Sequence, residues 1–274
     1  IIDSDDSNPV ITSSATFTAD ENQTAIGTVT AVDEDSTEFI FSISGSEIAI
    51  DSSSGVLTFV AAPDYETKSS YSATVTVSDG TNSDTQDITV SIIDLNDNIP
   101  VITSSSSFSV NEGGGLGATV ATLTATDADA NATLSFVLSG TDAASFTLDS
   151  TTGVLAFVGE PDYEIQASYA ITLTVSDGDN EVNQSITVSI INLNDSDPVF
   201  TSSNTFSADE NQTAIGTVTA TDADGDSLTF SLFGADANSV DVGSDTGVLT
   251  FAEAPDYETK SSYVFGVRVS DGEN

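Results

Sequence analysis

The sequence repeats itself three times with a period of about 95 residues. Several independent motifs return at this period, in the same order within each repeat. They are Gly-Val-Leu (55–57, 153–155, 247–249), Asp-Tyr-Glu (64–66, 162–164, 256–258) and Val-Ser-Asp-Gly (77–80, 175–178, 269–272). A fixed period of this length indicates an array of similar structural units, each stacked on its neighbours.

The repeat boundaries divide the chain into one fragment and three units. We expect residues 1–8 to be the end of a preceding repeat with its linker. Residues 9–98 and 99–196 form the first and second repeats with their linkers, and residues 197–274 form a third repeat that lacks its last strand.

The sequence of each repeat predicts β-strands, and no segment has the period of a helix. Apolar residues alternate with Ser or Thr, a period of two that is typical of strands with one buried face. In the first repeat the expected strands are 17–19, 25–32, 39–44, 48–51, 55–59, 71–78 and 85–93. The predicted fold class is all-β: seven-stranded antiparallel Greek-key β-sandwiches of the immunoglobulin-like kind, arranged linearly.

Composition excludes several classes of function. The formal net charge is −41, which argues against nucleic acid and anionic membrane surfaces as partners. The chain contains no Cys and no His, so disulfides, Ser-His-Asp catalysis and histidine–metal chemistry are absent. No apolar run approaches the ~18–20 residues of a membrane span, so no membrane insertion is expected. Because paired carboxylates recur in every repeat rather than in one cleft, we predict that the chain is not an enzyme.

Acidic residues occur at repeated places in the predicted loops. Asp-Tyr-Glu lies before the sixth strand, paired Asp residues follow the second strand, and an Asp ends the sixth strand. A Phe-x-x-x-Glu pattern lies early in each repeat, and an Asp/Asn-rich segment joins one repeat to the next. These loops lie at the two poles of a sandwich, so stacking the repeats brings two sets of carboxylates together.

This set of motifs resembles the cadherin repeat, in order and in spacing, over the whole chain. The short loop Asp222-Ala-Asp224-Gly-Asp226 resembles the bacterial branch of that family, in large surface adhesins or fibres. The resemblance implies about three Ca²⁺ ions at a complete junction, held by hard oxygen ligands. At the first junction the implied ligands are Glu21, Asp64, Glu66, Asp94, Asn96, Asp97, Asn98, Asp127, Asp129 and Asp177.

The second junction departs from this pattern, because Asn192 stands in place of an Asp and Ser196 in place of an Asn. The implied ligands there are Glu112, Asp162, Glu164, Asn192, Asn194, Asp195, Asp222, Asp224 and Asp271. We expect fewer or weaker ions at this junction. The two ends carry half junctions: Asp3, Asp5, Asp6, Asp33, Asp35 and Asp79 at one end, and Glu210, Asp256 and Glu258 at the other.

The predicted function is a calcium-rigidified stalk or fibre of a surface adhesin, extracellular or at the cell surface. The alternative is a calcium-dependent carbohydrate-binding module, against which the absence of Trp and of Tyr outside two repeated positions argues. Expected partners are further repeats of the same chain or identical subunits, and a glycan or cell-surface ligand.

Both ends of the chain align with the interior of a repeat. Residues 1–6 align with 92–97, and Asn274 aligns with Asn180, which precedes the predicted strand 181–189. Together with the absence of Met, this predicts an excerpt of a longer array. Strand donation between subunits, filling an open sheet edge, is the alternative.

Overall fold

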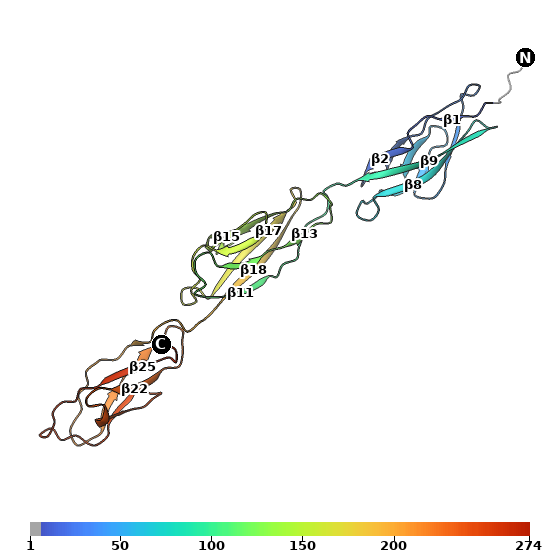
Figure 1. The fold of residues 1–274 in the computed structure, drawn as a ribbon. Coiled ribbons are helices and arrows are strands. Elements are labelled where there is room, and N and C mark those ends of the chain that lie inside the picture. The colour runs from blue at the N-terminus through green and yellow to red at the C-terminus, as the bar shows by residue number, and fades with distance from the viewer. Residues whose placement is uncertain (1–6) are drawn as a thin grey trace, which may run out of the picture.

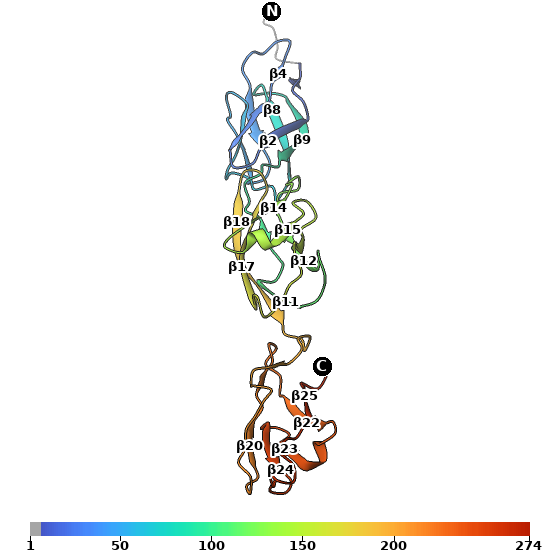
Figure 2. The ribbon, with the colours of Figure 1, turned by 90° about the vertical axis from the view of Figure 1, so that its left-hand side faces the viewer.

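The computed structural model describes residues 7–274 and places three β-sandwiches end to end in a line (Figure 1). The predicted roles of Ile1–Asp6 lie outside the described residues. Figure 2 shows the C-terminus at the end of the third sandwich that faces the second, because the last strand runs back toward the second linker. No helix in the described range 7–274 is long and apolar enough to cross a membrane.

The first sandwich consists of a four-stranded sheet in the order β2-β9-β8-β5, a three-stranded sheet in the order β3-β7-β6, and a short pair β1-β4. The strands are β1 (Val10–Ile11), β2 (Thr16–Asp20), β3 (Ala25–Thr28), β4 (Ala31–Val32), β5 (Ile40–Ile43), β6 (Ile48–Ile50), β7 (Val56–Phe59), β8 (Ser70–Ser78) and β9 (Ser83–Ile93).

The second sandwich repeats this topology: β11-β18-β17-β14 faces β12-β16-β15, with the pair β10-β13 beside them. Its elements are β10 (Val101–Ile102), β11 (Ser107–Asn111), β12 (Thr119–Thr122), β13 (Ala125–Thr126), β14 (Ser135–Ser139), the short 3₁₀ helix η1 (Ala143–Ser145), β15 (Phe146–Leu148), β16 (Val154–Phe157), β17 (Ser168–Ser176) and β18 (Glu181–Ile191).

The third sandwich keeps β20-β24-β23 and β19-β21, but its other sheet has two strands, β22-β25. Its elements are β19 (Val199–Phe200), β20 (Ala214–Thr217), β21 (Ala220–Thr221), β22 (Thr229–Phe233), η2 (Ala237–Ser239), β23 (Val240–Val242), β24 (Val248–Phe251) and β25 (Gly266–Ser270).

The all-β prediction is confirmed, and three details of it are wrong. Residues 25–32 form two strands rather than one, because the chain changes sheets where the Val29 amide donates to Gly55. The short strand β1, which pairs with β4, was not predicted. The pairing of β2 with β9 is parallel, and β11 pairs with β18 in the same way, so the sheets are not wholly antiparallel.

The Gly-Val-Leu motif forms the centre of each sandwich. Leu57, Leu155 and Leu249 are at most 1% exposed. The glycine before each of them has a positive φ, 71° at Gly153, and a Cβ there would lie 2.1 Å from the Leu123 carbonyl oxygen. The motif recurs because only glycine fits where the turn before β16 approaches the backbone that follows β12.

We therefore expect Gly153→Ala to destabilise the second sandwich strongly. The backbone conformation alone costs about 1–3 kcal/mol for a residue with a Cβ, and the clash with the Leu123 carbonyl adds to this. Urea unfolding with calcium present measures the loss. Gly159→Ala is the matched control, because Gly159 has no atom within 4 Å of an added Cβ. Equal midpoints for both variants would contradict the packing described above.

Candidate metal centres

The first junction lies between the first two sandwiches and collects acidic residues from both. Its members come from the end of β2, the β7–β8 loop, the linker 94–98, the loop after β13 and the end of β17. Carboxylate oxygens lie within 4.8 Å of one another in three groups, namely Glu21/Asp64/Glu66, Glu66/Asp94/Asp129 and Asp127/Asp129/Asp177. Glu66 and Asp129 each belong to two groups, so the groups form a continuous chain across the junction.

Two buried carboxylates hold the linker in place. Glu21 is only 2% exposed and accepts hydrogen bonds from the Tyr65 amide (2.8 Å) and the Leu95 amide (2.8 Å). Asp129 is 6% exposed and accepts from the Asn98 amide (3.0 Å) and Asn98 Nδ2 (2.7 Å). The linker is thus attached at one end to the first sandwich and at the other to the second.

Several of the predicted ligand oxygens are buried without a hydrogen-bond partner. In the described part of the chain, fourteen side-chain atoms have this property, and ten belong to predicted ligand residues. At the first junction they are Asp94 Oδ1, Asn96 Oδ1, Asp127 Oδ2 and Asp177 Oδ2. A buried unpartnered carboxylate oxygen is costly, and these are the hard oxygen ligands that Ca²⁺ takes. The residues present therefore fit a calcium site.

Three carboxyl groups at the junctions, those of Glu66, Glu164 and Asp195, have raised pKa values. Burial, and then the nearby charge of Glu21, raises the pKa of Glu66 above its ordinary value. Burial also raises the pKa of Glu164 and of Asp195, with the neighbouring charges of Glu112 and Asp224 adding to the effect. A bound cation would reverse this, since an opposite charge favours the ionised carboxylate.

The pKa of Asp177 is shifted in the opposite direction, below its ordinary value. The Asn180 amide donates to Asp177 Oδ1 at 2.6 Å and lowers the pKa of this carboxyl, and the Asp179 amide donates to the same oxygen at 2.8 Å. The second oxygen, Oδ2, is buried and has no partner. One oxygen thus fixes the turn after β17 and the other is left for a ligand.

The second junction has the same hydrogen bonds around its buried glutamate as the first. Glu112, 3% exposed, accepts from the Tyr163 amide (2.6 Å) and the Leu193 amide (2.5 Å), as Glu21 does in the first repeat. Its carboxylate lies within 4.8 Å of those of Glu164, Asp195 and Asp224. Asp222 and Asp271 each keep a buried Oδ2 without a partner, as do their counterparts Asp127 and Asp177.

Asn192 and Ser196 stand where the first junction has Asp94 and Asn98, and the two replacements change different contacts. Ser196 still donates its amide to Asp224 Oδ2 (2.8 Å), so the backbone contact of Asn98 is kept and only the side-chain contact is lost. Asn192 donates Nδ2 to the Asp224 carbonyl (2.8 Å), and its Oδ1 is buried without a partner. Asn192 thus points an oxygen into the junction as Asp94 does, but without the charge.

The remaining predicted residues lie in the same loops. Asp162 Oδ1 accepts from the Ile165 amide (2.9 Å), and Asn194 Oδ1 accepts from Asn274 Nδ2 (3.1 Å). At the far pole Glu210, Asp256 and Glu258 lie within 4.8 Å of one another and are all exposed. At the other end Asp33 and Asp79 each have a buried unpartnered Oδ2, and the Asp35 carboxylate accepts from the Ser7 amide (3.2 Å). Asp3, Asp5 and Asp6 lie outside the described residues.

Two asparagines that support the first junction were not predicted from the sequence. Asn22 Nδ2 donates to Asp97 Oδ2 (2.5 Å), and Asn180 Nδ2 donates to the Asn98 carbonyl (3.0 Å). Asn22 has a counterpart in Asn211, and the two share a left-handed backbone, with φ of 63° and 62°. Asn180 has its counterpart in Asn274. This repetition was a signal that could have identified both positions.

Comparison with known proteins agrees with this fold and these motifs. Residues 106–194 match the family model described as "Cadherin domain". A solved structure of mouse cadherin-23 EC22-24 superposes with a TM-score of 0.77 at 26% identity, covering 92% of this chain and 90% of that one. The protocadherin gammaB7 EC3-6 cis-dimer structure gives a TM-score of 0.82 at 23% identity over 99% of this chain and 75% of the other. The fold is therefore a tandem array of cadherin-like β-sandwich domains.

The curated relatives are far longer than this chain. A Drosophila melanogaster fat-like cadherin-related tumor suppressor homolog is 31% identical over 253 residues, which are 81% of this chain and 5% of that protein. Mouse protocadherin Fat 4 is 34% identical over 142 residues, which are 48% of this chain and 3% of that protein. Cadherin repeats are extracellular adhesion modules and not enzymes, as predicted. These relatives are animal proteins, and they do not support the bacterial origin suggested by the loop 222–226.

Proposed function

We propose that this chain is a calcium-stiffened segment of an extended adhesion array. The ions lie in the two junctions and fix each sandwich relative to the next. The observation that supports this most strongly is the set of buried carboxylate oxygens without partners at the predicted ligand positions. We propose that the chain divides into three repeats at the boundaries given above. We also propose that about three ions bind at the first junction and fewer at the second.

The charge of the first junction explains why a cation would be needed. The eight acidic residues among its predicted ligands converge there, and two charges ~6 Å apart repel by roughly 2–3 kcal/mol at an effective dielectric of ~20. Without ions this repulsion acts across the linker 94–98 and drives the two sandwiches apart or out of line. Three divalent cations nearly cancel the eight charges, and because each contacts ligands of both repeats and the linker, they hold the two sandwiches together.

The partners we propose are further repeats of the same kind, in the same chain or in identical subunits of a surface adhesin. The protocadherin gammaB7 EC3-6 structure of similar fold is a cis-dimer of that protocadherin, and identical subunits of this chain could pair in a comparable way. Each repeat contacts only its neighbours along the line in Figure 1, so an array of this kind extends without changing its internal contacts.

Calorimetric titration of the full chain with Ca²⁺ tests the proposal. We expect two classes of site, the weaker at the second junction, and Asn192→Asp should tighten that class because added ligand charge strengthens oxygen-ligand sites. The control is Asn238→Asp, which adds the same charge on an η2 residue outside the junctions. Absence of binding would overturn the proposed function. Binding with equal classes, or no gain in Asn192→Asp, would overturn only the inequality of the junctions.

A further inference from the structure

The residue that begins each linker forms a hydrogen bond with a loop of the repeat that follows. Asp94 contacts the loop 127–134, between β13 and β14, and Asn192 contacts the loop 222–228, between β21 and β22. A carboxylate only accepts hydrogen bonds, whereas an asparagine amide donates through Nδ2 and accepts through Oδ1. The two loops can therefore present different backbone groups to the two linkers.

The first loop presents donors to Asp94. Asp94 Oδ2 accepts from the Ala130 amide (3.0 Å) and from Asn131 Nδ2 (3.4 Å). The carbonyl of the same peptide group, that of Asp129, accepts from the Ala132 amide (3.3 Å) and closes a turn within the loop. The peptide group 129–130 thus points its N–H toward the linker and uses its carbonyl inside the loop.

The second loop presents an acceptor from the equivalent peptide group, 224–225. The Asp224 carbonyl accepts from Asn192 Nδ2 at 2.8 Å, so this peptide group points its opposite side toward the linker. Gly225 has a φ of 83°, whereas Ala130 is not among the described residues with a positive φ. Reversing a peptide group places the next residue at positive φ, as in a type II turn compared with type I, and this favours glycine. Glycine at position 225 therefore permits the reversed orientation.

The reversed peptide group determines which atom of Asn192 faces the junction. Because a carbonyl only accepts hydrogen bonds, it binds Nδ2 and leaves Oδ1 on the other side of the amide. Among the described residues, Asn192 Oδ1 is buried without a hydrogen-bond partner, as is Asp94 Oδ1 at the first junction. Calcium takes oxygen ligands, amide oxygens included, and an amide nitrogen is not one of them. The orientation of the peptide group 224–225 thus determines whether Asn192 can act as a ligand.

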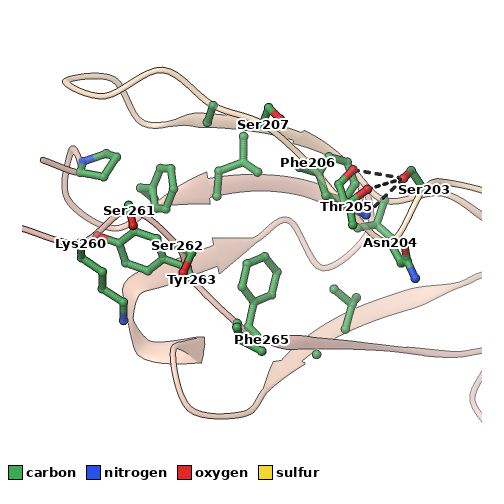
Figure 3. A pocket seen from close by; sticks show the side chains of 18 of the residues that line it. Ser203, Asn204, Thr205, Phe206, Ser207, Lys260, Ser261, Ser262, Tyr263 and Phe265 are labelled. Carbon is green, nitrogen blue, oxygen red and sulfur yellow. Dashed lines mark hydrogen bonds between the residues drawn. The ribbon is translucent and has the colours of Figure 1, made fainter. Parts of the chain in front are cut away.

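The loop 222–228 is separate from a cavity in the same sandwich. This cavity has a volume of about 760 Å³, and Figure 3 shows Phe206, Tyr263 and Phe265 among the side chains that line it. Neither Asn192 nor the loop lines the cavity. A Cβ added at Gly225 would have no atom of the described residues within 4 Å. A substitution of Gly225 by alanine therefore acts through the backbone conformation, without filling a cavity or creating a clash.

We propose that Gly225 is a positioning residue of the second junction, which orients the peptide group 224–225 so that Asn192 presents its oxygen to the bound ion. This inference rests on the proposed function and adds that each linker is matched to the repeat that follows it. The linker that begins with Asp94 fits a loop that presents an N–H. The linker that begins with Asn192 fits the reversed peptide group. The second and third repeats are therefore not interchangeable behind a given linker.

Calorimetric Ca²⁺ titration of Gly225→Ala, Asn192→Asp and the double variant, each in the full chain, tests this proposal. Gly225→Ala favours the orientation found at Ala130, so the amide of residue 225 binds Asn192 Oδ1 and Nδ2 turns toward the ion. We expect the affinity of the second junction to fall about tenfold or more, as for other changes in ligand orientation. A carboxylate has an oxygen on both sides. Asn192→Asp should therefore raise the affinity about fivefold more in the Gly225→Ala background than in the unchanged chain, since the two positions are coupled. This rescue would also show that the alanine variant folds.

Gly45→Ala is the matched control. Gly45 has nearly the same φ, 84°, an added Cβ there also has no atom of the described residues within 4 Å, and it lies in the first repeat. This change should leave the second junction unaltered. An unchanged affinity in Gly225→Ala, or an equal gain from Asn192→Asp in both backgrounds, would overturn this inference while calcium binding by the unchanged chain stands. Absence of calcium binding by the unchanged chain would overturn the proposed function, and this inference with it.

Discussion

Removing calcium should make the array flexible while each sandwich stays folded. Small-angle X-ray scattering of the full chain should show a shorter mean end-to-end dimension and a broader distribution of distances after chelation. Far-ultraviolet circular dichroism should change little. The physical reason is that the linkers 94–98 and 192–196 are short, and each buried apolar cluster of the described residues lies within a single sandwich. Repulsion between uncompensated carboxylates then acts on the linkers alone.

Restoring calcium is the control, and it should return the original scattering profile. Magnesium at the same concentration should be a poor substitute, because it demands near-octahedral geometry with shorter ligand distances and gives up water reluctantly. A scattering profile that is identical with and without chelator would contradict a role of calcium in stiffness. Loss of the β-sheet signal on chelation would show instead that the ions stabilise the sandwiches themselves.

Asp129→Asn should weaken calcium binding at the first junction more than any other single change there. Asp129 belongs to two of the three carboxylate groups and also holds the linker through Asn98. We expect a loss of affinity on the order of 10–100-fold or more, since changes to residues that only orient metal ligands already cost that much. Titration followed by calorimetry measures the change, and the second junction should be unaffected.

The matched control for this substitution is Asp241→Asn, which removes the same charge from an exposed position on β23 of the third repeat. This change should leave both junctions unaltered. If Asp129→Asn and Asp241→Asn gave the same calcium isotherm, the ions would be held by general surface charge, and the assignment of ligands at the first junction would be wrong.

Much of this architecture could be predicted from the sequence because the signal is repeated three times. Alternation of apolar and polar residues in 71–78 and in 88–92 marks the two long central strands. The predicted bounds 71–78 and 85–93 lie within two residues of those of β8 and β9. Once the ends of such strands are known, the positions of the loops that carry the acidic motifs can be predicted. The carboxylates of Glu21, Asp64 and Glu66, which come from two distant segments of the sequence, do come together in the structure.

The features that could not be predicted depend on contacts between distant segments. The alternation in 25–32 continues through Val29, so nothing local marks the change of sheet that the Gly55 carbonyl enforces. The parallel pairing of β2 with β9 depends on the path of the connections, which a pattern of period two does not encode. The segment 205–209 has no strand structure, although its sequence alternates as that of β2 does.

Calcium binding at the junctions through the named oxygens is tested most directly by a crystal structure of the full chain grown with Ca²⁺. Anomalous scattering identifies the ions without reference to the expected sites. We predict peaks at the first junction within 2.3–2.6 Å of Asp94 Oδ1, Asp127 Oδ2 and Asp177 Oδ2, the range for calcium–oxygen bonds. A well-ordered first junction without anomalous peaks, or with ions bound only at acidic residues outside the junctions, would contradict the account.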